Sequence, residues 1–389
     1  MAECSNAPEH ISILVDLGGV MHGAVKQVAV VYVDNVPGHR CTLPPGTRFL
    51  ELTIFRFPLS AFSSQLFLHA LARLATSLTL FSMESALIEW LGRTLPPHPL
   101  LKLGLGDDAA VLALGQGSDY LVTTDVITDH VDFKLAETTP QRIGRKALAV
   151  NLSDIAAMAG EPLAAVVGLV LPREGGFELA QGIFAGLFPL AEEYQVAIAG
   201  GDTNSWDGPL VVSVTLIGRA TDRKPLRRDG ARPGDKIIVT GNFGGSILGR
   251  HFDFTPRVRE ALLLNDRYQL HAGMDVSDGL SLDLSRLAKA SGCGAQIELT
   301  KVPISNDARR LADQSGDVTT ALDHALQDGE DFELLLAVPP DEARRMLDEQ
   351  PLGVSLACIG EFVAERGLWQ VDDRGQVAPL TPRGYQHQI

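Results

Sequence analysis

The chain has 389 residues, of which 45% are hydrophobic and 21% are charged, and its formal net charge is -15 at pH 7. This length allows about two or three domains, and the composition is ordinary for a globular protein. The acidic balance argues against nucleic acid as a partner, because a nucleic-acid-binding surface needs a basic footprint.

The first 82 residues carry no chemical motif. Apolar runs at 11–15 and 28–33 predict strands, and residues 61–80 predict a helix. We expect residues 1–82 to be an extension of no recognised fold, and we hypothesise that translation starts at Met83, where an amphipathic helix begins. On that hypothesis, this stretch has no selected packing partner.

From residue 83 onward, predicted strands and helices alternate in two halves, which are joined by a connector rich in Gly, Pro and charge at 227–235. In the first half, strands are predicted at 120–124, 166–171, 196–199 and 210–217, and helices from Pro140 and at 177–194. In the second half, strands are predicted at 236–240, 272–275, 296–299, 332–338 and 355–359, and helices at 278–291 and 341–349. This mixture predicts α/β or α+β layered domains at 83–226 and 227–389.

The chemistry of the chain centres on the acidic turn Gly104-Leu105-Gly106-Asp107-Asp108. Two adjacent carboxylates resist ionisation unless a cation or hydrogen-bond donors offset their repulsion. Further acidic turns, nearly all at the ends of apolar runs, are Thr123-Thr124-Asp125, Ser153-Asp154, Gly200-Gly201-Asp202, Asp275-Val276-Ser277-Asp278 and Gly329-Glu330-Asp331. Together they predict one site, assembled from distant segments, that suits magnesium bound to carboxylate and phosphate oxygens.

Each motif also has a plainer interpretation. Gly104 to Ala109 fits a loose dinucleotide-binding pattern, but its aspartates would lie where the anion should be. Asp125 can belong to a strand-end turn, and Ser277 or Asp278 can cap a helix, although capping leaves Asp275 unexplained. Arg228 can pair with phosphate or be a solvated connector residue, whereas Asp154 lies among apolar neighbours and needs a partner.

Seven motifs support a more specific interpretation. They are Gly106-Asp107-Asp108, Thr123-Thr124-Asp125, the run from Lys146 to Met158, Gly200-Gly201-Asp202-Thr203, Arg228 with Pro233-Gly234-Asp235, Asp275-Val276-Ser277-Asp278-Gly279-Leu280 and Gly329-Glu330-Asp331-Phe332-Glu333-Leu334. From Met83 to the C-terminus, the sequence resembles the thiamine-monophosphate kinase family of the aminoimidazole ribonucleotide synthetase superfamily.

The resemblance implies a two-domain fold like that of aminoimidazole ribonucleotide synthetase, each domain a mixed sheet packed by helices, with the N-terminal domains pairing in a homodimer. It implies ATP-dependent phosphorylation of thiamine monophosphate to thiamine diphosphate. The implied ligands of several magnesium ions are Asp108, Thr123, Thr124, Asp125, Asp154, Asp202, Asp275 and Asp278. The implied ATP contacts are Gly201, Asp202, Arg228 and Ser277, and the implied thiamine contacts are Glu330 and Tyr385.

One substrate position departs from the family pattern, because Asp132 stands where the family usually carries a histidine. We expect direct in-line transfer without a catalytic base, since positioning and charge cancellation dominate phosphoryl transfer. The alternatives are another ATP-dependent synthetase of the superfamily and a non-catalytic nucleotide-binding regulator, and the intact aspartates argue against the regulator.

The expected compartment is the cytoplasm, with no membrane partner. The most apolar stretch, 57–81, carries His69 and Arg73, which disfavours a membrane span. Four widely separated cysteines give neither a zinc motif nor a disulfide framework: Cys4, Cys41, Cys293 and Cys358.

Overall fold

The computed structural model of the protein describes residues 13–16, 28–34, 54–58, 83–115, 117, 119–315 and 319–387. The chain divides into two compact units, Met1–Met83 and Glu84–Ile389. In the first unit, β1 (Ile13–Asp16), β2 (Val28–Asp34) and β3 (Ile54–Pro58) form a three-stranded sheet with β2 in the middle. The strands predicted at 11–15 and 28–33 are confirmed, and the helix predicted at 61–80 lies outside the described residues.

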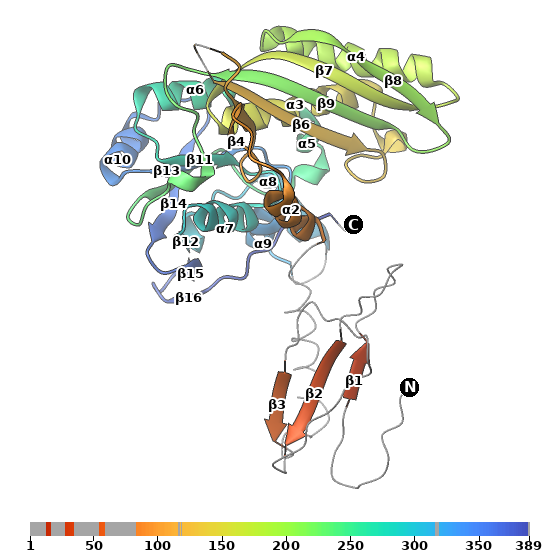
Figure 1. The fold of residues 1–389 in the computed structure, drawn as a ribbon. Helices are drawn as coiled ribbons and strands as arrows, with labels where there is room; N and C mark the ends of the chain where they lie inside the picture. Colours follow the sequence, from red (N-terminus) through yellow and green to blue (C-terminus); the bar gives the residue numbers. More distant parts are fainter. Residues whose placement is uncertain are drawn as a thin grey trace, which may run out of the picture. The chain divides into compact units, whose positions relative to one another are not determined.

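The second unit begins with α2 (Met83–Thr94) and a six-stranded mixed sheet (Figure 1). In spatial order its strands are β4 (Leu101–Leu103), β5 (Ala110–Leu112), β6 (Tyr120–Thr128), β9 (Val211–Ala220), β7 (Gly160–Pro172) and β8 (Ala197–Trp206). Only the β7–β8 pair is parallel among these strands. The helices α3 (Pro140–Ala157) and α4 (Gly176–Glu193) cover one face of this sheet.

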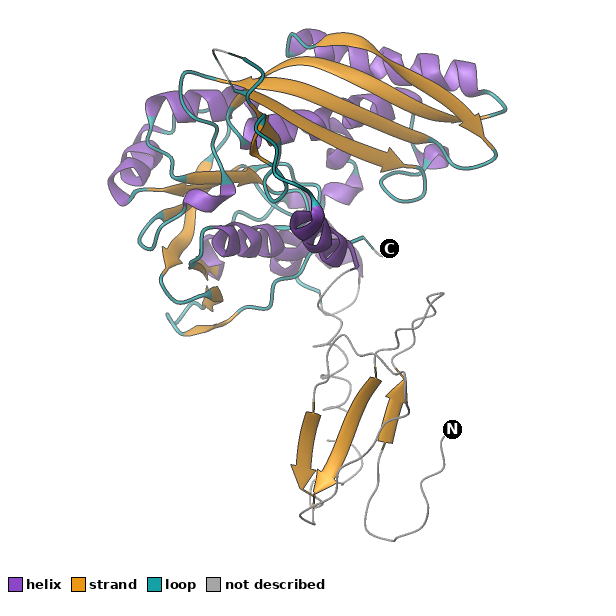
Figure 2. Ribbon diagram, in the orientation of Figure 1, coloured by secondary structure: helices purple, strands orange, loops and turns teal. Residues whose placement is uncertain are grey.

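A seven-stranded mixed sheet follows, with helices on both faces (Figure 2). Its order is β11 (Ala272–Asp275), β13 (Leu334–Val338), β10 (Lys236–Thr240), β14 (Leu356–Val363), β12 (Gly294–Glu298), β15 (Gly367–Val371) and β16 (Val377–Pro379). The larger helices here are α6 (Val258–Arg267), α7 (Leu280–Ala290), α8 (Asn306–Ser315), α9 (Ala321–Gln327) and α10 (Pro340–Glu349). The short helix α5 (Arg250–Asp253) contacts α3.

Helix α3 lies at the centre of the second unit. Thr139 caps its start through its side chain, and Pro140 occupies the first turn, as expected for a helix N-terminus. The sequence pattern predicted one buried face, but almost every residue from 146 to 157 is buried. The reason is that one hydrophobic core continues from the first sheet through α3 to α6, α10 and the second sheet. The two halves therefore share a core.

Several predicted boundaries are wrong, and in two strands the cause is pairing with another strand far along the chain. Strand β6 continues through Asp125 to Thr128, because it pairs with β9 in unbroken register. Strand β8 likewise continues through Gly200-Gly201-Asp202, pairing with β7 past a single bulge. Strands β10 and β11 match their predicted ranges. No helix in the described part of the chain has an apolar run long enough to cross a membrane.

Candidate metal and substrate site

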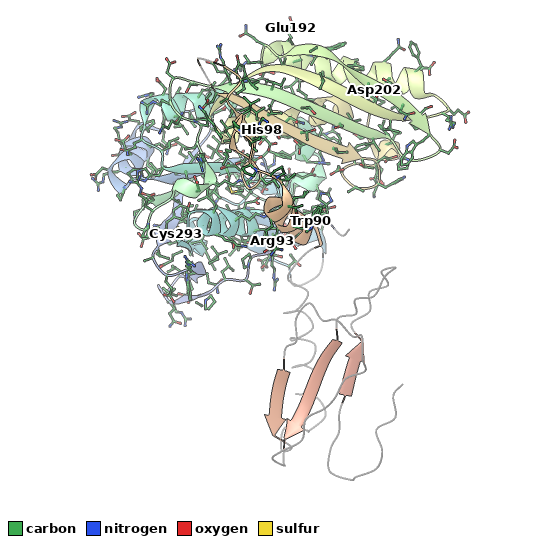
Figure 3. The ribbon with its side chains drawn as sticks, in the orientation of Figure 1. Trp90, Arg93, His98, Glu192, Asp202 and Cys293 are labelled. Atoms are coloured by element: carbon green, nitrogen blue, oxygen red, sulfur yellow. The ribbon has the colours of Figure 1, made fainter. Side chains whose placement is uncertain are left out.

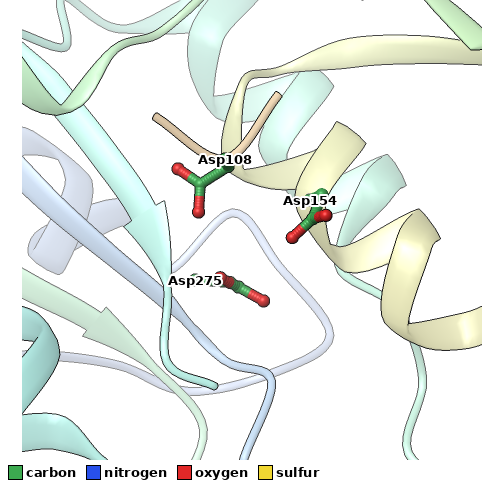
Figure 4. Close-up of side chains that lie close together, drawn as sticks. All are labelled: Asp108, Asp154 and Asp275. Carbon is green, nitrogen blue, oxygen red and sulfur yellow. The ribbon is translucent and has the colours of Figure 1, made fainter. Parts of the chain in front are cut away.

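Three aspartates from distant segments converge. Ligand atoms of Asp108, Asp154 and Asp275 all lie within 4.8 Å of one another (Figure 4). Asp108 follows the 104–107 turn, Asp154 lies in the last turn of α3, and Asp275 ends β11. The loop between β4 and β5, the central helix and the second sheet thus each supply one carboxylate. We call Asp108, Asp154 and Asp275 the acidic cluster.

Local structure holds each member of the acidic cluster in place. Gly106 has a φ of 106°, which a residue with a side chain rarely adopts, and this turn brings the following carboxylates inward. Ser153 donates its hydroxyl to Asp275 Oδ2 at 2.5 Å, which ties α3 to β11. Thr123 donates its hydroxyl to Asp154 Oδ2, which ties β6 to α3. The site is therefore built where the two sheets meet.

The electrostatics of the cluster favour a cation. Burial, followed by the charges of Asp125, Asp275 and Asp108, raises the pKa of Asp154 well above its usual value. Burial and then the charge of Asp108 raise the pKa of Asp275 in the same way. Like charges held this close in a poorly solvated place are costly when they are ionised. A bound cation would remove that cost.

Strand β6 brings the Thr-Thr-Asp motif to the cluster on alternate faces. The side chains of Thr123 and Asp125 share the inward face, whereas Thr124 faces outward and bonds to Thr215 across the sheet at 3.0 Å. Asp125 Oδ2 is buried with no hydrogen-bond partner. Burial, then the charges of Asp132 and Asp278, raises the pKa of Asp125 to about 6. An orphaned buried carboxylate oxygen is rare and points to a missing ligand.

Arg228 is not a solvated connector residue. Its guanidinium makes two hydrogen bonds to Asp108, at 3.0 Å from Nε and 2.5 Å from Nη2, and only 20% of its side chain is exposed. Its backbone N–H donates to Asp107 at 3.1 Å. A bidentate arginine beside a buried acidic cluster is also placed to meet a phosphate.

The remaining predicted ATP residues lie in two places. Asp202 and Gly201 are exposed on β8, the edge strand of the first sheet, and the Asp202 carboxylate accepts only from the neighbouring N–H of Thr203 (Figure 3). Ser277 is half-buried near the acidic cluster, and its carbonyl accepts from Glu330 N at 2.6 Å. The second unit by itself therefore brings Ser277, but not Asp202, to the cluster.

Neither residue considered as a helix cap caps α7. Instead, Asp283 Oδ2 accepts from the N–H groups of Asp278 and Gly279 at 2.9 and 3.1 Å. The Asp278 carboxylate pairs with Arg286 and lies close enough to Asp125 to raise the pKa of that carboxyl, after burial. Asp278 therefore belongs electrostatically to the acidic site.

The predicted substrate residues gather beside Asp125. Burial is the main cause that raises the pKa of Asp132, and the charge of Glu330 adds to it while Lys146 and His387 oppose it. Glu330 pairs with Lys146. The Tyr385 backbone N–H donates to Asp278 O at 2.8 Å, which brings the C-terminal segment to the same region.

Sequence reasoning missed the partners of Glu330. In the sequence Lys146 stands only as part of a motif, and His251 belongs to no motif. A lysine among the apolar residues of a helix predicted to be buried was the available signal, since lysine is almost never fully buried without a partner. No pattern in the sequence pairs it with a residue so far along the chain.

The donor set fits magnesium. Carboxylates of the acidic cluster, the orphaned Asp125 oxygen and the nearby Asp278 offer only oxygen ligands, which this hard cation prefers. Calcium accepts the same ligand type, but it takes more of them in a looser geometry.

Magnesium should stabilise the protein more at pH 8 than at pH 5. Burial is the main cause that raises the pKa of both Asp107 and Asp125 to about 6 in the folded protein. A raised carboxyl pKa favours folding below the unfolded pKa of about 4, and this contribution is lost as the pH rises through about 6. At pH 8 the carboxylates of Asp107 and Asp125 are ionised and repel their neighbours without a cation, whereas at pH 5 protons compete with the metal.

Thermal melts with and without saturating magnesium chloride at both pH values measure this effect. We expect the melting temperature to rise by about 5 °C at pH 8, as a ligand at 100 times its Kd would produce, and by much less at pH 5. Sodium chloride at matched ionic strength controls for screening. Equal increases at the two pH values would contradict titration of these carboxyls.

The comparisons with known proteins agree with this geometry. Residues 106–220 match the family AIR synthase related protein, N-terminal domain, and residues 232–369 match the corresponding C-terminal domain. The thiamine-monophosphate kinase of Rhodopirellula baltica is 42% identical over 312 residues, which cover 78% of this chain and 97% of that protein.

Two solved structures share the fold. One, described as AaThiL complexed with AMPPCP and TMP, has a TM-score of 0.67 and 28% identity, covering 77% of this chain and 96% of the other. The thiamine-monophosphate kinase from Stenotrophomonas maltophilia K279a has a TM-score of 0.59 and 32% identity, covering 76% and 96%. With its acidic cluster at the junction of two AIR synthase related domains, the chain belongs to the thiamine-monophosphate kinase family.

Proposed function

We propose that this protein transfers the γ-phosphoryl group of ATP directly to the phosphate of thiamine monophosphate, forming thiamine diphosphate. The observation that carries the proposal is the convergence of Asp108, Asp154 and Asp275 beside the Arg228 guanidinium. Membership of the thiamine-monophosphate kinase family supports it, as does the related structure described as a complex with AMPPCP and TMP.

The chemistry of the reactants explains the acidic site. Both substrates are anions, so carboxylates alone would repel them. Magnesium would be held by Asp108, Asp125, Asp154, Asp275 and Asp278, with the Thr123 hydroxyl as a further oxygen donor. The Thr124 hydroxyl and the Asp202 carboxylate, also implied by the resemblance, do not join this set, because Thr124 faces outward and Asp202 is exposed on β8. When bound, it supplies positive charge that offsets the repulsion between the phosphates and stabilises the charge of the transferring group.

The protein's own groups then position the two phosphates. Arg228 would release Asp108 in part to contact ATP, with Ser277 as a further contact. The acceptor is a phosphate oxygen that is already ionised at neutral pH, so no side chain has to remove a proton. We therefore propose in-line transfer with no phosphoenzyme and no catalytic base.

The outer face of the first sheet supports a homodimer. Opposite α3 and α4 this face carries exposed apolar side chains, among them Val126 at 55%, Val166 at 42% and Ile217 at 38% exposure. Exposed apolar patches on a sheet are typical of interaction surfaces. We propose that residues 83–226 form the N-terminal domain and residues 227–389 the C-terminal domain. We also propose that this face of the N-terminal domain pairs with the same face of a second copy. We also propose that the enzyme works in the cytoplasm.

Glu330→Gln should raise the KM for thiamine monophosphate by about tenfold, because hydrogen bonds to a charged group contribute about 1.5–3 kcal/mol. The KM for ATP should stay within about twofold, since Glu330 lies outside the acidic cluster. The measurement is steady-state turnover of ATP in magnesium with each substrate varied. If the wild-type protein shows no ATP turnover that depends on thiamine monophosphate, the proposed function is wrong. Equal changes in both KM values would instead assign Glu330 to the ATP and metal side.

A further inference from the structure

Lys146 is fully buried, and three polar atoms lie within reach of its ammonium group. Its Nζ lies 2.7 Å from the carbonyl of Asp132 and 2.9 Å from His251 Nδ1, and it forms an ion pair with Glu330 Oε1. The side chain of Lys146 is 0% exposed. The carbonyl of Asp132 and the carboxylate of Glu330 accept two of its three protons. His251 Nδ1 accepts no proton from Lys146 in the tautomer whose Nδ1–H donates to Glu330 Oε2.

These partners come from three separate segments around the candidate substrate site. Asp132 follows β6, His251 lies on α5, and Glu330 lies in the loop before β13. His251 is also buried, and its Nδ1 lies 3.1 Å from Glu330 Oε2. Each oxygen of the Glu330 carboxylate therefore faces one of these side chains, Oε1 toward Lys146 and Oε2 toward His251.

Glu330 differs from the acidic residues that follow it in the loop. Asp331 accepts hydrogen bonds from Ser246 and Gly244, and its side chain is 0% exposed. Glu333 accepts hydrogen bonds from Arg257 and Thr240, and its side chain is 4% exposed. The Glu330 side chain is 29% exposed, so it is far more accessible to a ligand than either of them. Its φ of 64° is uncommon for a residue with a side chain and requires support from its surroundings.

We infer that Lys146 and His251 are positioning residues that fix the Glu330 carboxylate toward the thiamine end of the substrate. The inference rests on the proposed function. Each carboxylate oxygen has two lone pairs. One pair on each is used by the protein, and the other remains for an N–H donor or the positive charge of the ligand. Without Lys146 and His251, the Glu330 carboxylate would no longer be held in one orientation. The loop would also lose the contacts that support the positive φ of Glu330.

The test compares substitutions at both positions with a matched control. Lys146→Met keeps the length of the side chain but removes its charge and donors, and His251→Gln removes the ring. Each should raise the KM for thiamine monophosphate by about tenfold and leave the KM for ATP within about twofold. Lys301→Met is the control, because Lys301 forms an exposed ion pair with Glu298 and contacts none of Lys146, His251 and Glu330 in the described part of the chain. It should change neither KM.

A double-mutant cycle separates positioning from general packing. If Lys146 acts through Glu330, Lys146→Met should add almost nothing to the KM of a Glu330→Gln protein. If the effects of the two substitutions on the KM for thiamine monophosphate are fully additive, or if both KM values change equally, the inference is wrong. The activity of the wild-type protein tests the proposed function separately. If Lys146→Met does not fold, Lys146→Gln, which retains two N–H donors, and His251→Gln give the same comparison. An unchanged KM for thiamine monophosphate in His251→Gln would then count against the inference.

Discussion

Asp125→Asn is expected to reduce phosphoryl transfer by at least about a thousandfold while leaving the fold intact. Asp125 combines an orphaned buried oxygen with a raised pKa, which are the properties of a group held ready for a ligand. Losing one preorganised electrostatic group at a reacting centre costs about 10²–10³ in kcat, and loss of a metal ligand adds to this. The measurement is kcat at saturating magnesium, ATP and thiamine monophosphate.

The stability of the same variant should move in the opposite direction. Ionised Asp125 is destabilised in the folded protein by burial and by Asp132 and Asp278. A neutral amide of the same shape should leave the metal-free melting temperature at pH 8 equal or higher. Asp207→Asn is the control, because Asp207 forms an exposed ion pair with Arg173, and it should change neither quantity. If the Asp125→Asn protein retains near-normal turnover, Asp125 is not a ligand in the metal site.

Gly144→Ala is expected to lower the free energy of unfolding of the second unit. A Cβ at Gly144 would lie 1.9 Å from the carbonyl oxygen of Ile183 on α4, and one at Gly186 would lie 1.8 Å from that of Gln141 on α3. The two helices therefore touch backbone to backbone at two glycines. An added methyl group must push them apart and displace the helix that carries Asp154 and Lys146.

Overpacking of this kind costs about 1–3 kcal/mol, which corresponds to a fall in melting temperature of roughly 2–4 °C for each kcal/mol. Gly92→Ala is the matched control, since Gly92 lies in α2 with nothing within 4 Å of the added Cβ. This substitution should leave the melting temperature unchanged or raise it, because alanine has a higher helix propensity than glycine. If the Gly144→Ala protein has the same melting temperature as the wild type, α3 and α4 can move apart at little cost in free energy.

Local patterns in the sequence predicted most elements of the second unit. Strands β10 and β11 are short apolar runs with clear ends, and Pro140 marks the start of α3. The motif aspartates pointed to one site, and Asp108, Asp154 and Asp275 do converge. These features depend on residues near one another in the chain, and such patterns record them directly.

Other features depend on distant partners. Nothing near Asp125 shows that β6 continues past it, because the cause is pairing with β9. The amphipathic pattern of α3 did not reveal that Lys146 lies in a core shared by two sheets. The position of Asp202 on an exposed edge strand likewise follows from sheet order, which residue spacing does not encode.

The pairing of Lys146 with Glu330 has a consequence for biosynthesis. The ribosome makes α3 long before the loop that carries Glu330, and at roughly 5–20 residues per second the interval is on the order of ten seconds or more. During that time Lys146 has no anionic partner, and burying an unpaired ammonium group is unfavourable. The nascent first half should therefore stay loosely packed around α3. The arrival of the late loop gives Lys146 its anionic partner, so a chain that stalls before Glu330 should be recognised by proteases as unfinished.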